Sequence, residues 1–219
     1  MGTWVVTGAN RGIGLELARQ LHERGEAVVA ACRTSSAALE ALGCAVVDGI
    51  DVARDEAGAR IDTALDGSID VLLHNAGILN RDGLADLDAE GVRAQFEANA
   101  LGPLRLTRAL RHRLGRGARV AFVSSKAGSI GDRPAGGMYG YRMSKAALNM
   151  AAANLAHELR PDGIAVIALH PGFVRTGMTD GAGNVAAPDA ARGLIERIDE
   201  LTLASTGRFL HADGTELPW

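Results

Sequence analysis

Short apolar segments alternate with longer amphipathic segments along the whole chain of 219 residues. The apolar segments are rich in valine, isoleucine and alanine, which is typical of strands buried on both faces of a sheet. The longer segments have the helical period, and several stop at a glycine, as helices commonly do. The predicted strands are Thr3–Val6, Ala27–Ala31, Ala45–Val47, Ile69–Leu73, Arg119–Val123, Ala165–Leu169 and Arg208–Leu210. The predicted helices are Gly12–Arg24, Ser36–Leu42, Ala53–Leu65, Glu90–Leu114, Tyr139–Leu159 and Asp189–Thr202.

This regular alternation of strand and helix is typical of the α/β class. It predicts a Rossmann-type, doubly wound parallel sheet of about seven strands with helices on both faces. No repeat, low-complexity segment or linker interrupts the alternation, so residues 1–219 are expected to form a single domain. Sheets of this kind bind ligands beyond the carboxyl ends of their strands. Candidate functional residues should therefore follow directly after the strands.

Composition and charge narrow the classes of partner. The formal net charge of -3 gives no basic field for nucleic acid, so no nucleic-acid partner is expected. Cys32 and Cys44 fall in or beside predicted buried strands, where free thiols are typical of a reducing compartment. The six histidines lack metal-ligand spacing, and no structural metal is expected. No apolar segment reaches membrane-spanning length and no leader precedes the first strand, so we expect a cytoplasmic protein without a membrane partner.

A glycine-rich loop follows the first strand. Residues 7–14 read TGANRGIG and lead directly into an amphipathic helix. Glycines here permit a tight turn, let the backbone approach a pyrophosphate and expose the positive helix N-terminus to its charge. The spacing is GxxxGxG instead of GxGxxG, and three glycines alone could mark a simple strand-to-helix turn. The complete octet resembles the coenzyme motif of the short-chain dehydrogenase/reductase family, which implies pyrophosphate-contacting and helix-packing roles for Gly8, Gly12 and Gly14.

Two further segments strengthen the resemblance. His74-Asn75-Ala76-Gly77 ends the fourth strand and resembles the family's NNAG segment, with His74 in place of the first asparagine. We interpret His74 as a core histidine with satisfied hydrogen bonds. Residues 99–103 read NALGP and resemble the family's NxxGP segment, in which the asparagine interrupts the helix and its carbonyl holds a water for proton relay. The alternative is that Asn99 is a helix-surface residue before a kink at Pro103.

The fifth strand and the helix after it carry the candidate catalytic residues. Ser125 matches the family's catalytic serine, whereas Ser124 is expected to face the sheet. Tyr141 and Lys145 form the YxxxK pair, which a helix places on one face. A phenol is a poor base at neutral pH until a cation stabilises its phenolate, so we expect Lys145 to lower the pKa of Tyr141. Tyr139 has no lysine four residues later, which leaves Tyr141 as the candidate.

Coenzyme contacts extend to both ends of the expected nicotinamide dinucleotide. Pro171 and Gly172 follow the sixth strand and resemble the family's segment at the nicotinamide end. No carboxylate follows the second strand, and Arg33 with Arg11 resembles the basic pair that binds the 2′-phosphate of NADP. NADP(H) is therefore the expected coenzyme, with NAD(H) as the alternative. The contacts that the resemblance implies are Gly8, Asn10, Arg11, Gly12, Ile13, Gly14, Arg33, Asp51, Val52, Asn75, Ala76, Gly77, Tyr141, Lys145, Pro171, Gly172, Val174 and Thr176.

The resemblance implies an oxidoreductase that transfers a hydride between the coenzyme and a small carbonyl or alcohol substrate. Tyr141 would exchange the proton and Ser125 would hydrogen-bond the carbonyl oxygen. Lys145 would also bind the nicotinamide ribose, and Asn99 would replenish the proton through water. Residues 136–149 and the final Leu217-Pro218-Trp219 look most similar to the C-factor and sniffer-like carbonyl reductase branch, although Trp219 could simply pack over the core. Two alternatives stay open: a nucleotide-binding signalling protein with little turnover, and an isomerase or dehydratase that retains its coenzyme.

The surroundings of the site follow from the same segments. Residues 126–140 form a long interval that contains Arg133 and Pro134, which predicts a flexible loop at the rim. Little sequence separates the sixth strand from the last helix, so we expect an open site floored by Phe173 and Met178. The two long predicted helices resemble those that pair between subunits in the family, and a homodimer or homotetramer is expected.

Overall fold

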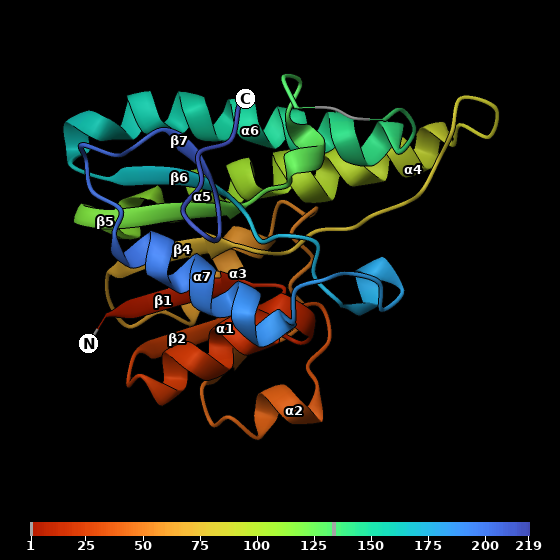
Figure 1. Cartoon of the computed structure of the whole chain (residues 1–219). Helices are drawn as coiled ribbons and strands as arrows, with labels where there is room; N and C mark the ends of the chain where they lie inside the picture. Colours follow the sequence, from red (N-terminus) through yellow and green to blue (C-terminus); the bar gives the residue numbers. More distant parts are fainter. Residues whose placement is uncertain (1, 133–134) are drawn as a thin grey trace.

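The computed structural model describes residues 2–132 and 135–219 and shows, within them, seven parallel strands in one sheet (Figure 1). The strand order is β3-β2-β1-β4-β5-β6-β7. The strands are β1 (Thr3–Thr7), β2 (Ala27–Ala31), β3 (Ala45–Val47), β4 (Ile69–His74), β5 (Leu114–Val123), β6 (Ala165–His170) and β7 (Arg208–His211). The predicted Rossmann-type α/β fold is confirmed by this topology and by its likeness to solved structures.

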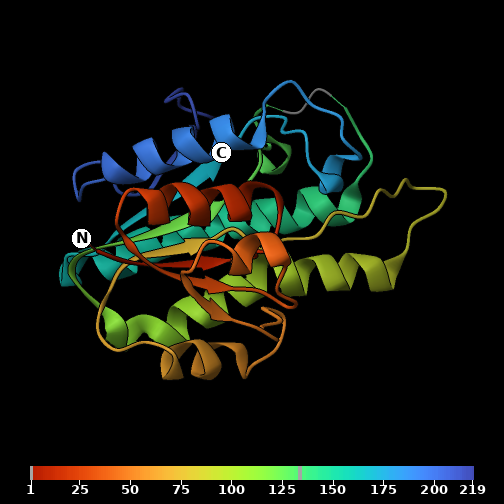
Figure 2. The ribbon, with the colours of Figure 1, turned by 90° about the horizontal axis from the view of Figure 1, so that it is seen from below.

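Helices cover both faces of the sheet (Figure 2). The α-helices are α1 (Gly12–Glu23), α2 (Ala37–Glu40), α3 (Ala57–Thr63), α4 (Ala89–Phe96), α5 (Gly102–Leu110), α6 (Tyr139–Leu159) and α7 (Ala187–Asp199). On one face, Leu17 of α1 and Leu194 of α7 are fully buried in a single apolar core. On the other, Leu106 of α5 and Leu148 of α6 pack around Phe122 of β5. Because both faces are covered, the central strands are continuously apolar, as the sequence pattern predicts.

The predicted helix 90–114 is divided in the structure. It consists of α4, a π-helical turn η1 (Glu97–Leu101) and α5. The expected interruption at Asn99 is confirmed, since the residue is fully buried and its side chain bonds to the backbone of Ile78 instead of lying on the helix surface. Insertion of one residue in a helical turn commonly occurs at functional sites.

The third helix begins at Ala57, four residues later than the Ala53 expected from the sequence pattern. The Asp51 carboxylate accepts a hydrogen bond from the Ala53 amide at 3.0 Å, and the Asp51 carbonyl accepts one from the Arg54 amide at 3.0 Å. These bonds close a turn that competes with helix. The turn places Asp51 and Val52 at the carboxyl edge of the sheet.

The carboxyl ends of the parallel strands lie along a single edge of the sheet, to the right in Figure 1. Loops that leave this edge therefore meet, although they are far apart in the sequence. Among the described helices, none is both long enough and apolar enough to cross a membrane.

Candidate functional site

A cavity of about 590 Å³ opens at the carboxyl edge of the sheet, within the usual range for small-molecule sites. Of the coenzyme contacts predicted from sequence, the following line it: Gly8, Asn10, Arg11, Gly12, Ile13, Gly14, Arg33, Asp51, Val52, Asn75, Ala76, Gly77, Tyr141, Lys145, Pro171 and Thr176. Gly172 and Val174 lie outside its wall, and Val174 is buried against Val185. Wall residues that sequence reasoning missed are Cys32, Thr34, Ile50, Ile78, Ala98, Val123, Ser124 and Gly177.

The glycine loop has the geometry that a bound pyrophosphate needs. Gly8 and Gly12 have φ angles of 68° and 56°, a region that favours glycine. A Cβ at Gly14 would stand 2.1 Å from the Gly8 carbonyl oxygen, so the helix can approach the strand only without a side chain. No side chain of the described residues caps the N-terminus of α1, which leaves its amide groups and positive dipole end free to bind an anion. The loop therefore fits the diphosphate of a dinucleotide.

Thr7 and Asn75 hold the glycine loop to the end of β4. The Thr7 hydroxyl accepts hydrogen bonds from the amides of Asn75 at 3.0 Å and Ala76 at 3.1 Å. The Asn75 side-chain amide donates to the carbonyls of Thr7 at 2.9 Å and Gly8 at 3.2 Å. Four hydrogen bonds thus fix two adjoining loops that both line the cavity. Thr7 is a site residue that sequence reasoning had not singled out.

His74 is buried behind this wall and does not line the cavity. Its ring stacks on Phe122 with centroids 4.8 Å apart, and its Nε2 lies 2.9 Å from the Thr107 hydroxyl. Because that hydroxyl donates to the Pro103 carbonyl, Nε2 is the donor in the pair. Burial lowers the pKa of His74 to about 3, so the ring is neutral. The predicted core role is confirmed, but only Nε2 is satisfied, since Nδ1 has no hydrogen-bond partner among the residues that the structure describes.

Ser125, Tyr141 and Lys145 come together where β5 ends against α6. Ser125 is buried, and its hydroxyl lies near enough to the Tyr141 phenol to lower the pKa of that phenol. Lys145 is 4% exposed, and its ammonium lies 5.8 Å from the centre of the Tyr141 ring. Ser124 is also buried, donates to Asn149 of α6 and lines the cavity, whereas the sequence predicted that it faces the sheet. The three residues predicted from separate motifs therefore form one cluster, of which Tyr141 and Lys145 line the cavity and Ser125 does not.

The electrostatics of this cluster correct one expectation. Burial raises the pKa of Tyr141, and the hydrogen bond from Ser125 opposes that rise. Burial also lowers the pKa of Lys145 to about 8. The Lys145 ammonium donates to the Val123 carbonyl at 2.8 Å. The prediction that Lys145 lowers the pKa of Tyr141 is therefore wrong in this structure, because desolvation of the phenolate dominates.

Asn99, in the π-helical turn, is linked through Ser144 to the backbone of Tyr141. Its Oδ1 accepts from the Ile78 amide at 2.8 Å, and its Nδ2 donates to the Ile78 carbonyl at 2.9 Å and the Ser144 hydroxyl at 3.0 Å. The Ser144 hydroxyl in turn donates to the Tyr141 carbonyl at 2.8 Å. A Cβ at Gly77 would lie 3.1 Å from Asn99 Oδ1 and 3.7 Å from the Lys145 ammonium, so these groups share one crowded region.

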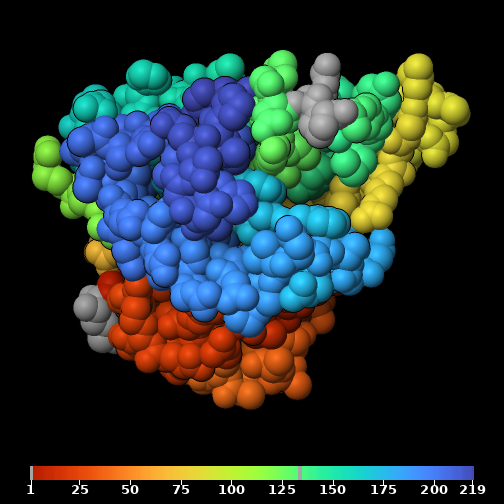
Figure 3. Space-filling view, viewed as in Figure 1, coloured from red at the N-terminus to blue at the C-terminus, as the bar shows by residue number. Residues whose placement is uncertain are grey.

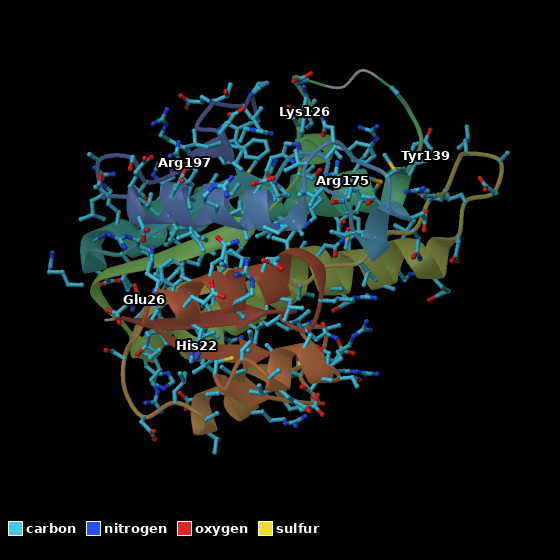
Figure 4. The ribbon with its side chains drawn as sticks, turned by 60° about the horizontal axis from the view of Figure 1, so that its bottom comes forward. His22, Glu26, Lys126, Tyr139, Arg175 and Arg197 are labelled. Carbon is cyan, nitrogen blue, oxygen red and sulfur yellow. The ribbon has the colours of Figure 1, made fainter. Side chains whose placement is uncertain are left out.

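Three segments border the mouth of the site. Tyr139 lies at the exposed start of α6, close to the loop after β4 (Figure 4), where the Met138 amide donates to the Asp82 carbonyl at 2.7 Å. Arg81 of the same loop pairs with Asp180, across the mouth, at 3.3 Å. Met178 lines the cavity as expected, and Phe173, which is 53% exposed, does not. Arg133 and Pro134 of the predicted rim loop lie outside the described residues.

The fold and this site define a dinucleotide-binding α/β protein, and comparison with known proteins gives its family. The model of the family described as short chain dehydrogenase matches residues 3–185. The chain therefore belongs to the short-chain dehydrogenase/reductase family. The curated 1-hydroxy-2-glutathionyl-2-methyl-3-butene dehydrogenase of Rhodococcus sp. (strain AD45) is 45% identical over 226 residues, and the alignment covers 100% of both chains. The C-signal of Myxococcus xanthus is 46% identical over 156 residues, which cover 70% of this chain and 94% of that relative.

Solved structures agree with this assignment. The carbonyl reductase Sniffer of D. melanogaster superposes with a TM-score of 0.90 at 29% identity over 100% of each chain. A carbonyl reductase from Pseudomonas aeruginosa PAO1 in complex with NADP gives a TM-score of 0.87 at 34% identity, again over 100% of each chain. The predicted similarity to the C-factor and sniffer-like branch is confirmed. The chain is thus a nicotinamide-dependent oxidoreductase that acts on small molecules.

Proposed function

We propose that this protein is an NADP(H)-dependent carbonyl reductase that uses Tyr141 as its proton donor. The observation that carries the proposal is the cluster of Ser125, Tyr141 and Lys145, of which Tyr141 and Lys145 line a coenzyme-sized cavity. A nucleotide-binding protein without turnover needs the glycine loop but has no use for a buried serine–tyrosine–lysine cluster. The same residues serve alcohol oxidation when the reaction runs in reverse.

The glycine loop and the strand ends would hold the coenzyme. The amides at the start of α1 would bind the diphosphate, and the turn at Asp51 and Val52 would contact the adenine. Thr176 and Pro171 would border the nicotinamide, and Lys145 would bind the ribose hydroxyls beside it. When bound, the reduced nicotinamide supplies the hydride, and the protein supplies orientation and the proton.

The raised pKa of Tyr141 suits proton donation. At neutral pH the phenol keeps its proton, so it can donate to a carbonyl oxygen as negative charge develops there. The Ser125 hydroxyl would donate a second hydrogen bond to the same oxygen. The phenolate that forms would be stabilised by the Ser125 hydroxyl, which lowers the pKa of Tyr141. A water on the Asn99 backbone carbonyl would then return a proton to the cluster.

NADP(H) is the coenzyme that the charges around the adenosine end support. Arg11 and Arg33 are exposed at the cavity wall, and neither makes an ion pair with any described residue. Asp48 is bound to the Ser35 amide at 2.8 Å and does not line the cavity. Two free guanidinium groups favour a 2′-phosphate, because they form charge-assisted hydrogen bonds with its oxygens. The Pseudomonas relative with NADP bound is consistent with this choice.

The test is a panel of aldehydes and ketones with NADPH, followed by nicotinamide absorbance. The panel includes, with NADP⁺, the alcohol named in the Rhodococcus relative, 1-hydroxy-2-glutathionyl-2-methyl-3-butene. On any active substrate, Tyr141→Phe should lower kcat by at least about a hundredfold, since it removes the general acid. Tyr139→Phe is the matched control, because it removes the other phenol, and should leave kcat unchanged. Full turnover by Tyr141→Phe would refute the catalytic assignment.

A second candidate, a signalling role with little turnover, is favoured by the C-signal of Myxococcus xanthus. The signalling hypothesis and the enzyme hypothesis predict different results in the coenzyme absorbance assay. Under the signalling hypothesis the protein binds the coenzyme, but no carbonyl or alcohol changes the nicotinamide absorbance, and Tyr141→Phe behaves as the wild type in every assay.

A further inference from the structure

A short segment, residues 215–219, turns back along β7 and ends against the loop that follows Ser125. We call it the return segment; it adjoins the green surface of residues 126–132 at the top of Figure 3, where it is dark blue. The Leu217 amide donates to the Phe209 carbonyl at 2.9 Å. The Trp219 ring stacks on Phe209 with centroids 5.4 Å apart and planes 26° apart. Since Phe209 belongs to the core, the return segment is anchored to the sheet.

The return segment holds the loop of residues 129–131 through backbone carbonyl groups. The amides of Ile130 and Gly131 both donate to the Trp219 carbonyl at 3.1 Å. The Ser129 hydroxyl donates to the Pro218 carbonyl at 2.6 Å. The Ile130 side chain is 75% exposed, so the loop gains little stability from apolar burial there. Its attachment depends on these hydrogen bonds.

The loop is connected to Ser125 by a single turn of helix, η3 (Lys126–Gly128). The Ala127 amide donates to the Ser125 hydroxyl at 3.1 Å, and the Gly128 amide donates to the Ser125 carbonyl at 2.9 Å. A Cβ at Gly128 would stand 2.6 Å from the Lys145 carbonyl carbon, so η3 lies directly on α6. The turn is held between α6 and the loop, and a shift of the loop would move Ser125.

We propose that the return segment, through the carbonyl groups of Pro218 and Trp219, positions the Ser125 hydroxyl against the Tyr141 phenol. Neither Pro218 nor Trp219 lines the coenzyme cavity. Their effect on the reaction would therefore act through Ser125 and leave coenzyme binding unchanged. The proposal rests on the proposed function, which gives the bond between Ser125 and Tyr141 its chemical role. Pro218 and Trp219 are positioning residues in this account, since they touch neither coenzyme nor substrate.

Three variants separate the contacts. Trp219→Ala removes the ring that fixes the carbonyl, and Trp219→Phe is the matched control because it can still stack on Phe209. Ser129→Ala removes the hydrogen bonds of the Ser129 hydroxyl to the carbonyl groups of Pro218 and Trp219, and the one that it accepts from the Asp132 amide, but keeps the Trp219 ring. We expect Trp219→Ala to lower kcat for carbonyl reduction by about tenfold to a hundredfold, as displacements of about 1 Å do. The Kd for NADPH should stay the same, and Trp219→Phe should keep most of the activity.

A second readout needs no turnover. The chain has 2 tyrosines, so in a Tyr139→Phe background the tyrosinate absorbance reports the ionisation of Tyr141 alone. The hydrogen bond from Ser125 lowers the pKa of Tyr141, and its loss should raise that pKa. We expect Ser125→Ala and Trp219→Ala each to raise the pKa of Tyr141, Ser129→Ala to raise it less, and Trp219→Phe to leave it unchanged. The double variant Ser125→Ala/Trp219→Ala should match Ser125→Ala alone.

An unchanged pKa of Tyr141 in both Trp219→Ala and Ser129→Ala would overturn the proposal. So would a lower melting temperature in Trp219→Ala with kcat and the pKa of Tyr141 unchanged, because that result describes a purely structural role. An effect of Trp219→Ala that persists in full on the Ser125→Ala background would also contradict it. Failure of the proposed function is distinguishable, since carbonyl reduction would then survive Tyr141→Phe whatever the titration shows.

Discussion

Lys145 offers a quantitative test of the electrostatics of the candidate site. Burial lowers its pKa from 10.5 to about 8, so the folded protein releases this proton more readily than the unfolded chain. Between these two pH values the unfolded chain binds more protons, and the free energy of unfolding must rise with pH. Since each pH unit of difference corresponds to about 1.4 kcal/mol, the rise amounts to about 3 kcal/mol. Below about pH 8 both states hold the proton and this contribution becomes constant.

The perturbation is Lys145→Met, which keeps the side-chain length and removes the titrating group. Urea denaturation of wild type and variant, without added coenzyme, gives the difference in the free energy of unfolding at each pH. We expect wild type to gain about 3 kcal/mol relative to Lys145→Met between pH 8 and 10.5. The control is Lys126→Met, at an exposed lysine paired with Asp132. The same subtraction with this variant gives the change in the free energy of unfolding that follows removal of a surface lysine. A difference for Lys145→Met that stays flat over this range would refute the reasoning.

Three further changes probe the coenzyme loop, the coenzyme preference and self-association. Gly14→Ala should weaken NADPH binding in fluorescence titrations and lower the melting temperature, because its Cβ would meet the Gly8 carbonyl at 2.1 Å. The control Gly67→Ala should change neither quantity, because nothing lies within 4 Å of its added Cβ. Arg33→Ala should weaken NADPH binding by roughly tenfold to a hundredfold, the equivalent of about 1.5–3 kcal/mol, and barely affect NADH; equal losses for both would exclude the proposed contact. We expect light scattering to show a dimer or tetramer that Met150→Lys dissociates, since Met150 is 62% exposed on α6, and a monomeric wild-type mass at micromolar concentration would contradict this.

The features that the sequence predicts best are those whose cause is local. The glycine loop has the spacing expected where a strand and a helix approach closely, and Gly14 in the structure has no room for a side chain. Tyr141 and Lys145 lie on one face because a helix places residues four apart together. The interruption at Asn99 is also predictable from its segment, and the structure shows it as a π-helical turn.

Features that depend on tertiary contacts could not be derived in the same way. The Thr7 hydroxyl joins β1 to the end of β4, 68 residues later in the sequence, and no local pattern indicates that pairing. The direction of the pKa of Tyr141 depends on how far burial outweighs nearby charges, which only the packed structure defines. The sequence leaves open that Trp219 simply packs over the core, and the contacts of its carbonyl with Ile130 and Gly131 emerge only from the fold.

Deuterium transfer tests the central claim most directly. With NADPH that carries deuterium at the reactive position of the nicotinamide, the account predicts an alcohol product labelled at the former carbonyl carbon. Mass spectrometry of the product should find one deuterium per coenzyme oxidised in the wild type and almost no product with Tyr141→Phe. Turnover without net oxidation of the coenzyme, or bound coenzyme with no labelled product from any carbonyl in the panel, would contradict the assignment as a carbonyl reductase.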